Sequence, residues 1–282
     1  MPGIRYRRSE WHKPGIEKGD LVAKSISKGI PVLMYHALED EAHPSGAKEP
    51  GDLLYVLQVS QFRDQMEWLH REGYRPFLLE ELAGAEWPEK SIVLTFDDGH
   101  ESNFALALPI LQEYGFKAEF FITTGWIGTP YFMNQVQIKG LCQAGMGIGS
   151  HGVTHRFLSD LSEAEIRDEF CDSKKVLEAC IVAPVTSMSY PGGRMNQLTQ
   201  CIAQACGFRY SCTSVPQLHQ QTSGDTRIDR FAVTADLTLD SFSALVQGQG
   251  LGALRFRHAL LATTKALLGN NLYTRLRTLF MR

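Results

Sequence analysis

The strongest constraint on the fold is a regular alternation of short, apolar, β-rich runs with amphipathic helical stretches. The runs that predict strands are residues 30–36, 91–96, 117–123, 146–151, 185–191, 208–213 and 227–233. The stretches that predict helices are residues 60–73, 103–115, 134–145, 162–180 and 196–207. Strands joined by helices lie parallel, so the pattern predicts a parallel α/β sheet or a barrel rather than a meander.

Residue types at the helix ends sharpen this interpretation. Ser60 is predicted to be the N-cap of the helix over 60–73, and Ser162 with Glu165 forms a capping-box pattern at the start of the helix over 162–180. Residues 37–59 are predicted to be a long loop, and long loops inside compact domains are often functional.

The chain of 282 residues fits one large α/β domain with extensions. We expect a polar, Gly-rich arm over 1–29, the barrel-like domain over 30–240 and a basic amphipathic helical tail over 241–282. Within that tail, residues 253–282 carry six basic residues and no acid. Such a segment can lie on an anionic membrane surface or cap the barrel with its arginines in solvent, and the sequence favours neither.

Composition bears on partners and location. A formal net charge of −3 gives no global reason to expect nucleic acid binding. The N-terminus has no apolar h-region, so we expect a cytoplasmic protein, peripheral on the inner face of the membrane if the basic tail binds there. The six cysteines form no CxxC pair and are expected to be reduced and buried, although their even number also permits disulfides.

Two adjacent carboxylates, Asp97 and Asp98, directly follow the strand predicted over 91–96. In parallel α/β folds the chemistry lies where strands end and loops begin. Neighbouring side chains on an extended segment point in different directions, so this pair is poorly placed as a glycosidase dyad. It suits one carboxylate on a metal and the other beside a water, or else a plain Asp-Gly turn.

Two histidines four residues apart, His151 and His155, follow the short Gly-rich strand predicted over 146–151. They can reach one point from a compact loop, and neutral imidazole is a common ligand of Zn²⁺. The spacing alone is weak because it also occurs by chance. One aspartate with two histidines leaves a coordination position open, as a catalytic site requires. Together with Asp98 they favour a metal site.

A third polar segment, Ser189-Tyr190-Pro191-Gly192-Gly193-Arg194, lies at the end of the strand predicted over 185–191. Pro191 fixes the turn, and the glycines let backbone N–H groups approach a ligand closely. The segment is therefore a candidate oxyanion-stabilising element, although Pro-Gly-Gly is also a generic turn.

In order and spacing, TFDDG, HGVTH and SYPGG resemble the motifs of the polysaccharide deacetylases with a NodB-homology domain, carbohydrate esterase family 4. The likeness runs from about residue 30 to residue 233, and its PVLMYH run looks like the opening of one subgroup. Three positions depart from the family pattern. Gly152 stands where Ser or Thr is common, Ser189 replaces an arginine and Gly192 replaces an aromatic residue.

The resemblance implies a distorted (β/α) barrel with fewer strands than a full TIM barrel, here with a helical C-terminal extension. It implies Asp98, His151 and His155 as ligands of a divalent metal, with Zn²⁺ expected and Co²⁺ or Ni²⁺ as alternatives. It also implies Asp97 as the base that deprotonates the attacking water, and an oxyanion contact from the backbone near Gly192.

The implied activity is hydrolysis of a linear amide C–N bond, which removes N-acetyl groups from an amino sugar in a polysaccharide, an oligosaccharide or a lipid-linked glycan. One alternative is a deformylase or another amide hydrolase on the same scaffold, because fold and metal do not fix the substrate. Another is a catalytically weakened carbohydrate-binding relative.

Two roles of the family have no match at their usual places. The arginine that orients the base is absent at Ser189, and Arg227 or Arg230 is predicted to supply it from the last strand. No counterpart of the family's proton-donating histidine is evident, since His258 lies in the basic tail. His36, at the end of the first strand, is predicted to donate the proton or bind substrate, or else to be an ordinary strand-end histidine.

Overall fold

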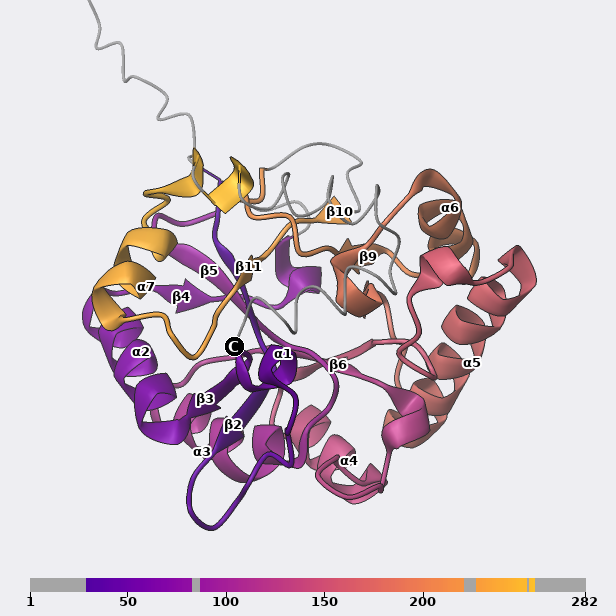
Figure 1. Cartoon of the computed structure of the whole chain (residues 1–282), viewed down its shortest axis with the longest axis horizontal. Helices are drawn as coiled ribbons and strands as arrows, with labels where there is room; N and C mark the ends of the chain where they lie inside the picture. The colour runs from indigo at the N-terminus through magenta and orange to yellow at the C-terminus, as the bar shows by residue number, and fades with distance from the viewer. Residues whose placement is uncertain (1–28, 83–86, 221–226, 253, 257–282) are drawn as a thin grey trace, which may run out of the picture.

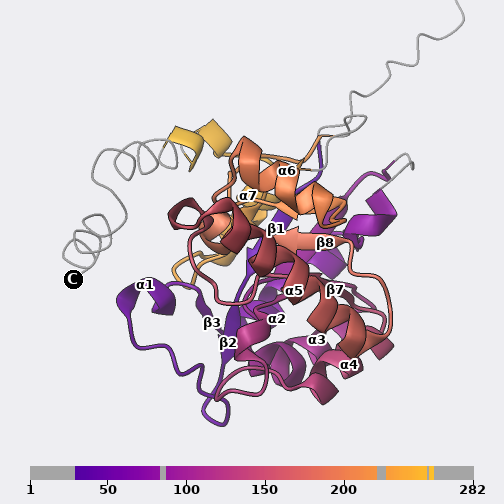
Figure 2. The same cartoon turned by 90° about the vertical axis from the view of Figure 1, so that its right-hand side faces the viewer.

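The framework of the molecule is a curled parallel sheet with helices around its outside, seen in the computed structural model of Figure 1 and Figure 2. The structure describes residues 29–82, 87–220, 227–252 and 254–256. The strands of the sheet are β1 (Val32–Tyr35), β4 (Arg75–Pro76), β5 (Ser91–Phe96), β6 (Glu119–Ile122), β7 (Gly147–Ser150), β8 (Ser187–Ser189), β9 (Tyr210–Cys212), β10 (Arg227–Ile228) and β11 (Phe231–Ala232).

The strand order is β10-β9-β8-β7-β6-β5-β1-β11, and β4 pairs with the start of β5. Because β10 and β11 follow one another in the chain yet lie at opposite ends of this order, the sheet curls until its two edges meet at residues 229–230. The result is a curled parallel sheet that forms a half-barrel, which confirms the distorted (β/α) barrel that the resemblance implies.

The helices that cover the sheet alternate with its strands along the chain. They are α2 (Val59–Arg71), α3 (Leu108–Glu113), α4 (Gln135–Gln143), α5 (Glu163–Ile181), α6 (Gln197–Ala205) and α7 (Leu239–Val246). The short helix α1 (Pro50–Leu53) precedes them and buries no residue. A π-helical turn over Asn103–Ala107 leads into α3. α7 crosses the predicted boundary at residue 240 and packs against α2, where the Phe242 and Trp68 rings lie 5.9 Å apart.

Successive residues of each strand face opposite sides of the sheet, which produces two apolar cores. On β1, Leu33 packs in the larger core under the helices, whereas its neighbour Val32 packs in a smaller core inside the curl. Both side chains are fully buried. Burial of this kind stabilises the fold by roughly 25 cal/mol per Å² of apolar surface removed from water.

The strand register brings the carboxyl ends of the strands to one rim. Tyr35 of β1 pairs with Phe96 of β5, and Ile122 of β6 pairs with Ser150 of β7. The residues after these strand ends therefore meet at one rim of the curl, where the predicted site residues lie.

Three local predictions are wrong. Residues 37–59 are not one loop, because β2 (Ala37–Glu39) pairs in parallel with β3 (Val56–Gln58) and α1 lies between them. Ser60 is not an N-cap: β3 runs straight into α2, which begins at Val59 after an extended Gln58 without a side-chain cap. The run 227–233 is two strands, since β10 pairs with β9 and β11 with β1.

The capping box of Ser162 and Glu165 is confirmed at the start of α5. The expectation that all cysteines are reduced is wrong for Cys171 and Cys206, which form a disulfide that joins α5 to the C-cap of α6. The packing of these two helices brings the Cα atoms to 5.5 Å, within the range that a disulfide requires. The four other cysteines are free.

Residues 1–28 of the predicted arm, and residues 253 and 257–282 of the tail predicted over 241–282, lie outside the described residues, so the domain division stays a prediction. Across the described ranges, no helix has the length and apolar character to cross a bilayer.

Candidate metal centre

The metal-ligand candidates converge at the rim of the sheet. Asp98 follows β5, while His151 and His155 lie in the loop after β7. Asp98 Oδ1 lies 3.4 Å from His151 Nε2 and 3.3 Å from His155 Nε2. One ligand atom from each residue lies within 4.8 Å of the others, and no further group of this kind occurs among the residues that the structure describes. The three residues thus come together as the sequence predicts.

The donor set fits a divalent cation. Asp98 Oδ1 is buried and has no hydrogen-bond partner, although two imidazoles face it. His151 Nδ1 lies 2.9 Å from the carbonyl oxygen of Ser189, which can only accept, so Nδ1 carries the proton and the lone pair of Nε2 faces Asp98. One carboxylate oxygen and two imidazole nitrogens are ligands typical of Zn²⁺, with a position left for substrate or water.

The electrostatics of the cluster also favour a cation. Burial raises the pKa of Asp98, but the imidazoles of His100, His151 and His155 outweigh it and hold the pKa well below its usual value. Burial lowers the pKa of His155, and the neighbouring Asp98 carboxylate outweighs this and raises it. The first shift means that the ionised carboxylate of Asp98 is favoured, and the second that a positive charge beside this carboxylate is favoured.

Asp97, the predicted base, is held by a bidentate salt bridge with Arg230. Arg230 Nη1 donates to Asp97 Oδ1 at 2.7 Å, and Nη2 donates to Oδ2 at 2.8 Å. The hydroxyl of Ser189 donates to the same carboxylate at 2.9 Å and accepts from Arg230. Burial raises the pKa of Asp97, but the charge of Arg230 and of His151 outweighs it and lowers the pKa to about 2. Asp97 is therefore an ionised acceptor with a fixed orientation.

Of the two arginines predicted to orient the base, the structure brings Arg230 to Asp97, the predicted base. The guanidinium of Arg230 is fully buried between the two edges of the curled sheet. Arg227 instead pairs with Asp229, where Nε lies 2.7 Å from Oδ1. Ser189, which replaces the family's arginine, bridges Asp97 and Arg230.

The third motif lies beside the candidate metal ligands, but its residues differ in how accessible they are to a ligand. The carbonyl of Ser189 bonds His151, so the motif is tied to the centre. The Tyr190 side chain is fully buried and packs edge-on against Phe170, so only its backbone can face a ligand. Burial raises the pKa of Tyr190 to about 12. Gly192 has a left-handed φ of 65°, and a Cβ there would lie 2.6 Å from the Phe157 ring.

Pro191 is also buried, and it begins the turn of residues 191–193. The predicted roles of Tyr190, Pro191 and Gly192 toward an oxyanion stay predictions.

His36 belongs to the same cluster of charges. Its ring packs on Tyr55 at 4.6 Å, and its buried Nδ1 has no hydrogen-bond partner. Burial lowers the pKa of His36, and this effect outweighs the opposite pull of Asp98 and Asp97. The neutral imidazole is therefore favoured, and a role as proton donor or substrate ligand stays a prediction.

The sequence gives no indication of one residue at the centre. Glu169, on α5, accepts hydrogen bonds from the loop between the two candidate histidine ligands. It is one of several acidic residues on an amphipathic helix, and no local pattern marks it.

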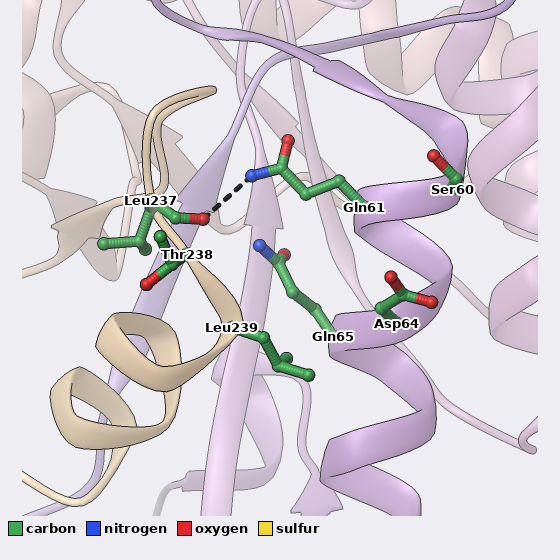
Figure 3. Close-up of a pocket in the computed structure, with 7 residues that line it drawn as sticks. All are labelled: Ser60, Gln61, Asp64, Gln65, Leu237, Thr238 and Leu239. Atoms are coloured by element: carbon green, nitrogen blue, oxygen red, sulfur yellow. Dashed lines mark hydrogen bonds between the residues drawn. The ribbon is translucent and has the colours of Figure 1, made fainter.

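A cavity of about 200 Å³ lies between the start of α2 and the start of α7 (Figure 3). It is lined by Ser60, Gln61, Asp64, Gln65, Leu237, Thr238 and Leu239. None of these residues belongs to the metal centre, so the cavity has no part in the chemistry derived from it.

Comparison with known proteins supplies an independent line of evidence. The family model described as polysaccharide deacetylase matches residues 84–211. The chain is 30% identical over 223 residues to "Putative polysaccharide deacetylase YxkH" of Bacillus subtilis (strain 168), a match that covers 77% of this chain and 76% of YxkH.

The chain is also 26% identical over 200 residues to the poly-β-1,6-N-acetyl-D-glucosamine N-deacetylase of Staphylococcus aureus (strain MRSA252), covering 64% of this chain and 69% of that protein. Among solved structures, the Streptococcus pyogenes deacetylase PplD in complex with acetate is similar, with a TM-score of 0.68 and 27% identity. That match covers 77% of this chain and 98% of PplD.

Proposed function

The chain belongs to the polysaccharide deacetylase family, and we propose that it is a metal-dependent hydrolase that removes N-acetyl groups from an amino-sugar polymer. The observation that carries the metal dependence is the convergence of Asp98, His151 and His155 around a buried carboxylate oxygen without a hydrogen-bond partner. Zn²⁺ is the expected ion, because its ligand preferences match this donor set.

The division of roles follows from the two carboxylates. When bound, a divalent metal supplies a Lewis acid that makes water a nucleophile near neutral pH and polarises the amide carbonyl. Asp97 accepts the proton of the attacking water, and Arg230 keeps its carboxylate ionised and oriented. A C–O bond forms at the acetyl carbon, the C–N bond breaks, and acetate and a free amine are released.

The backbone around Gly192 is proposed to stabilise the oxyanion that develops on the acetyl oxygen. His36 is proposed to contact the substrate or to pass a proton to the leaving amine. In either role it would lie close to Asp98 and Asp97, whose charges oppose the lowering of its pKa by burial.

For the substrate, we propose an N-acetylglucosamine polymer as the first candidate. Support comes from the relative in Staphylococcus aureus, whose name gives poly-β-1,6-N-acetyl-D-glucosamine as its substrate. The cytoplasmic location and the membrane contact of residues 253–282 stay predictions, since residues 253 and 257–282 lie outside the described part of the chain.

The test is release of acetate from N-acetylglucosamine oligomers. We expect acetate release that a chelator abolishes and added Zn²⁺ restores, and that Asp97→Asn eliminates. Asp172→Asn is the matched control, because that aspartate lies exposed on α5 and pairs only with Lys175 in the ion pairs seen among the described residues. Acetate release that persists in excess chelator would contradict metal dependence, and formate in place of acetate would support the deformylase alternative.

A further inference from the structure

Glu169 is a buried carboxylate that faces the loop between the two histidine ligands. It lies on α5 with 5% of its surface exposed. Its Oε2 accepts hydrogen bonds from the backbone N–H of Val153 at 2.6 Å and of Thr154 at 2.9 Å. Its Oε1 accepts the hydroxyl of Thr154. One side chain thus satisfies three donors of the loop between His151 and His155, and hydrogen bonds to a charged acceptor are the stronger kind.

The loop needs such support because its backbone is in an unfavourable region. His155 has a left-handed φ of 60°, which for a residue with a side chain costs roughly 1–2 kcal/mol. A conformation of this kind persists only where the surroundings determine it. Without Glu169 the loop would lose the acceptor for two adjacent N–H groups next to this residue.

Gly152 explains how the carboxylate comes so close. Its φ is 79°, and a Cβ built there would lie 2.9 Å from Glu169 Oε2. This is the position where the family pattern commonly has Ser or Thr. Here a side chain at 152 would crowd the carboxylate, so the anchor of the loop comes from α5 instead of from the loop itself.

The other side of the loop is held by the segment after β6. Thr124 N donates to the carbonyl of Gly152 at 3.0 Å, and Gly125 N donates to the carbonyl of Val153 at 2.9 Å. The loop is therefore bonded through its carbonyls on one side and through its N–H groups by Glu169 on the other. Removing Glu169 would release the N–H side alone.

We propose that Glu169 is a positioning residue that holds His155 in place as a metal ligand and so sets the metal affinity of the centre. The inference rests on the proposed function, because it concerns the metal site that this function uses. Glu169 is not one of the three ligands, and it acts through the loop. Partners of this kind behind metal ligands typically change metal affinity by about 10–100-fold.

The experiment measures metal binding directly. Zn²⁺ affinity is determined by competition with a chromophoric chelator, and the visible absorption of the Co²⁺-loaded protein reports the coordination geometry. Glu169→Ala is expected to weaken Zn²⁺ binding by about 10–100-fold and to change the Co²⁺ spectrum. Glu169→Gln can accept both N–H groups and donate to Thr154 Oγ1, so it should restore affinity to within about fivefold of the wild type.

Glu119→Ala is the matched control. Glu119 is equally buried, with 5% of its surface exposed, but it bonds Ser187 in the sheet and makes no hydrogen bond to the loop after β7 among those found in the described residues. Its removal should leave Zn²⁺ affinity within about twofold, whatever it does to stability. Loss of affinity on the same scale in both variants would overturn the proposal, because it would reduce Glu169 to a general stability residue.

If Glu169→Ala does not fold, Glu169→Asp replaces it. This variant keeps the charge but withdraws the carboxylate by one C–C bond, about 1.5 Å, so it should weaken Zn²⁺ binding by about tenfold. Wild-type affinity and an unchanged Co²⁺ spectrum in the variants that fold would overturn the role of Glu169 alone. A wild-type protein that binds neither ion would overturn the proposed function as well, which keeps the two failures distinguishable.

Discussion

Replacing Arg230 by methionine tests whether the buried pair with Asp97 organises the centre. Arg230 is fully buried, and the Asp97 side chain is 3% exposed, so solvent screens the pair little. All five N–H donors of the guanidinium are used: two bond Asp97, and one each goes to Thr95, Ser189 and the Thr213 carbonyl.

Methionine matches the aliphatic stem of arginine but has no donor, so the variant leaves a buried carboxylate without its cation. Removing one partner of a buried pair costs about 3–5 kcal/mol, and we expect the free energy of unfolding to fall by that amount. Arg167→Met should change it by at most about 1 kcal/mol, since Arg167 and Glu163 form an exposed pair on α5.

A double-mutant cycle with Asp97→Asn separates charge pairing from packing. In the double variant neither charge remains, so about 3 kcal/mol of the loss in Arg230→Met should be recovered. The measurement is denaturant unfolding of the four proteins, with the midpoint and the slope fitted together.

Activity and metal binding should separate in the same variant. Arg230→Met should lower acetate release by about 10–100-fold, because it removes charged hydrogen bonds that hold the proposed base. Its Zn²⁺ affinity should stay within about threefold, because none of the five hydrogen bonds of Arg230 goes to Asp98, His151 or His155. The reasoning would be refuted if the free energy of unfolding of Arg230→Met lay within about 1 kcal/mol of the wild-type value. It would also be refuted if the double variant recovered none of the lost stability.

Three further predictions concern pH, the disulfide and the metal. Burial raises the pKa of Glu119 from 4.5 to about 7, so its stabilising contribution is full below pH 4.5 and is lost as the pH rises through 7. Glu119→Gln should remove about 3 kcal/mol from the change in unfolding free energy between pH 4 and 8, and the same pH dependence of that free energy in both proteins would contradict this. Replacing Cys171 and Cys206 by serine should lower the free energy of unfolding by about 2–4 kcal/mol, given their separation of 35 residues, and a reductant should have the same effect on the wild type. A free energy of unfolding that neither change lowers would show that the disulfide does not form. Zn²⁺ at about 100 times its Kd should stabilise the protein by about 2.7 kcal/mol and so raise its Tm, and His155→Ala should abolish this rise. An equal rise in Tm in that variant would place the metal elsewhere.

The disulfide also bears on location. Such bonds persist in oxidising compartments, whereas a reducing cytoplasm keeps thiols free. The cytoplasmic location expected from the sequence therefore stays a prediction that the redox state of Cys171 and Cys206 in cells would test.

Much of the secondary structure could be predicted because its causes are local. The strand over residues 91–96 is β5 to the residue, since an uninterrupted apolar run suits a strand buried on both faces. The start of α5 is fixed by Ser162 and Glu165, because the side chain of each accepts a hydrogen bond from the backbone N–H of the other. The start of α2 is not predictable in this way, because pairing of β3 with β2 overrides the preference of Ser60.

For the candidate site, the sequence alone determined the residue types and their place at strand ends. Asp98 and the spacing of His151 and His155 predict a metal centre because parallel strands deliver their ends to one rim. The tertiary structure alone decided which side chains hydrogen-bond to the residues of that centre. Arg230, rather than Arg227, reaches Asp97 because β10 and β11 join opposite edges of the sheet at that point.

The position of Glu169 against the histidine loop and the Cys171–Cys206 bond have the same origin. Spacing along the chain determines whether residues close in sequence can form a helix cap, a strand or a pair of metal ligands. Contacts between residues far apart in sequence depend on how the sheet curls and how the helices dock on it, and these are set by packing of the whole core.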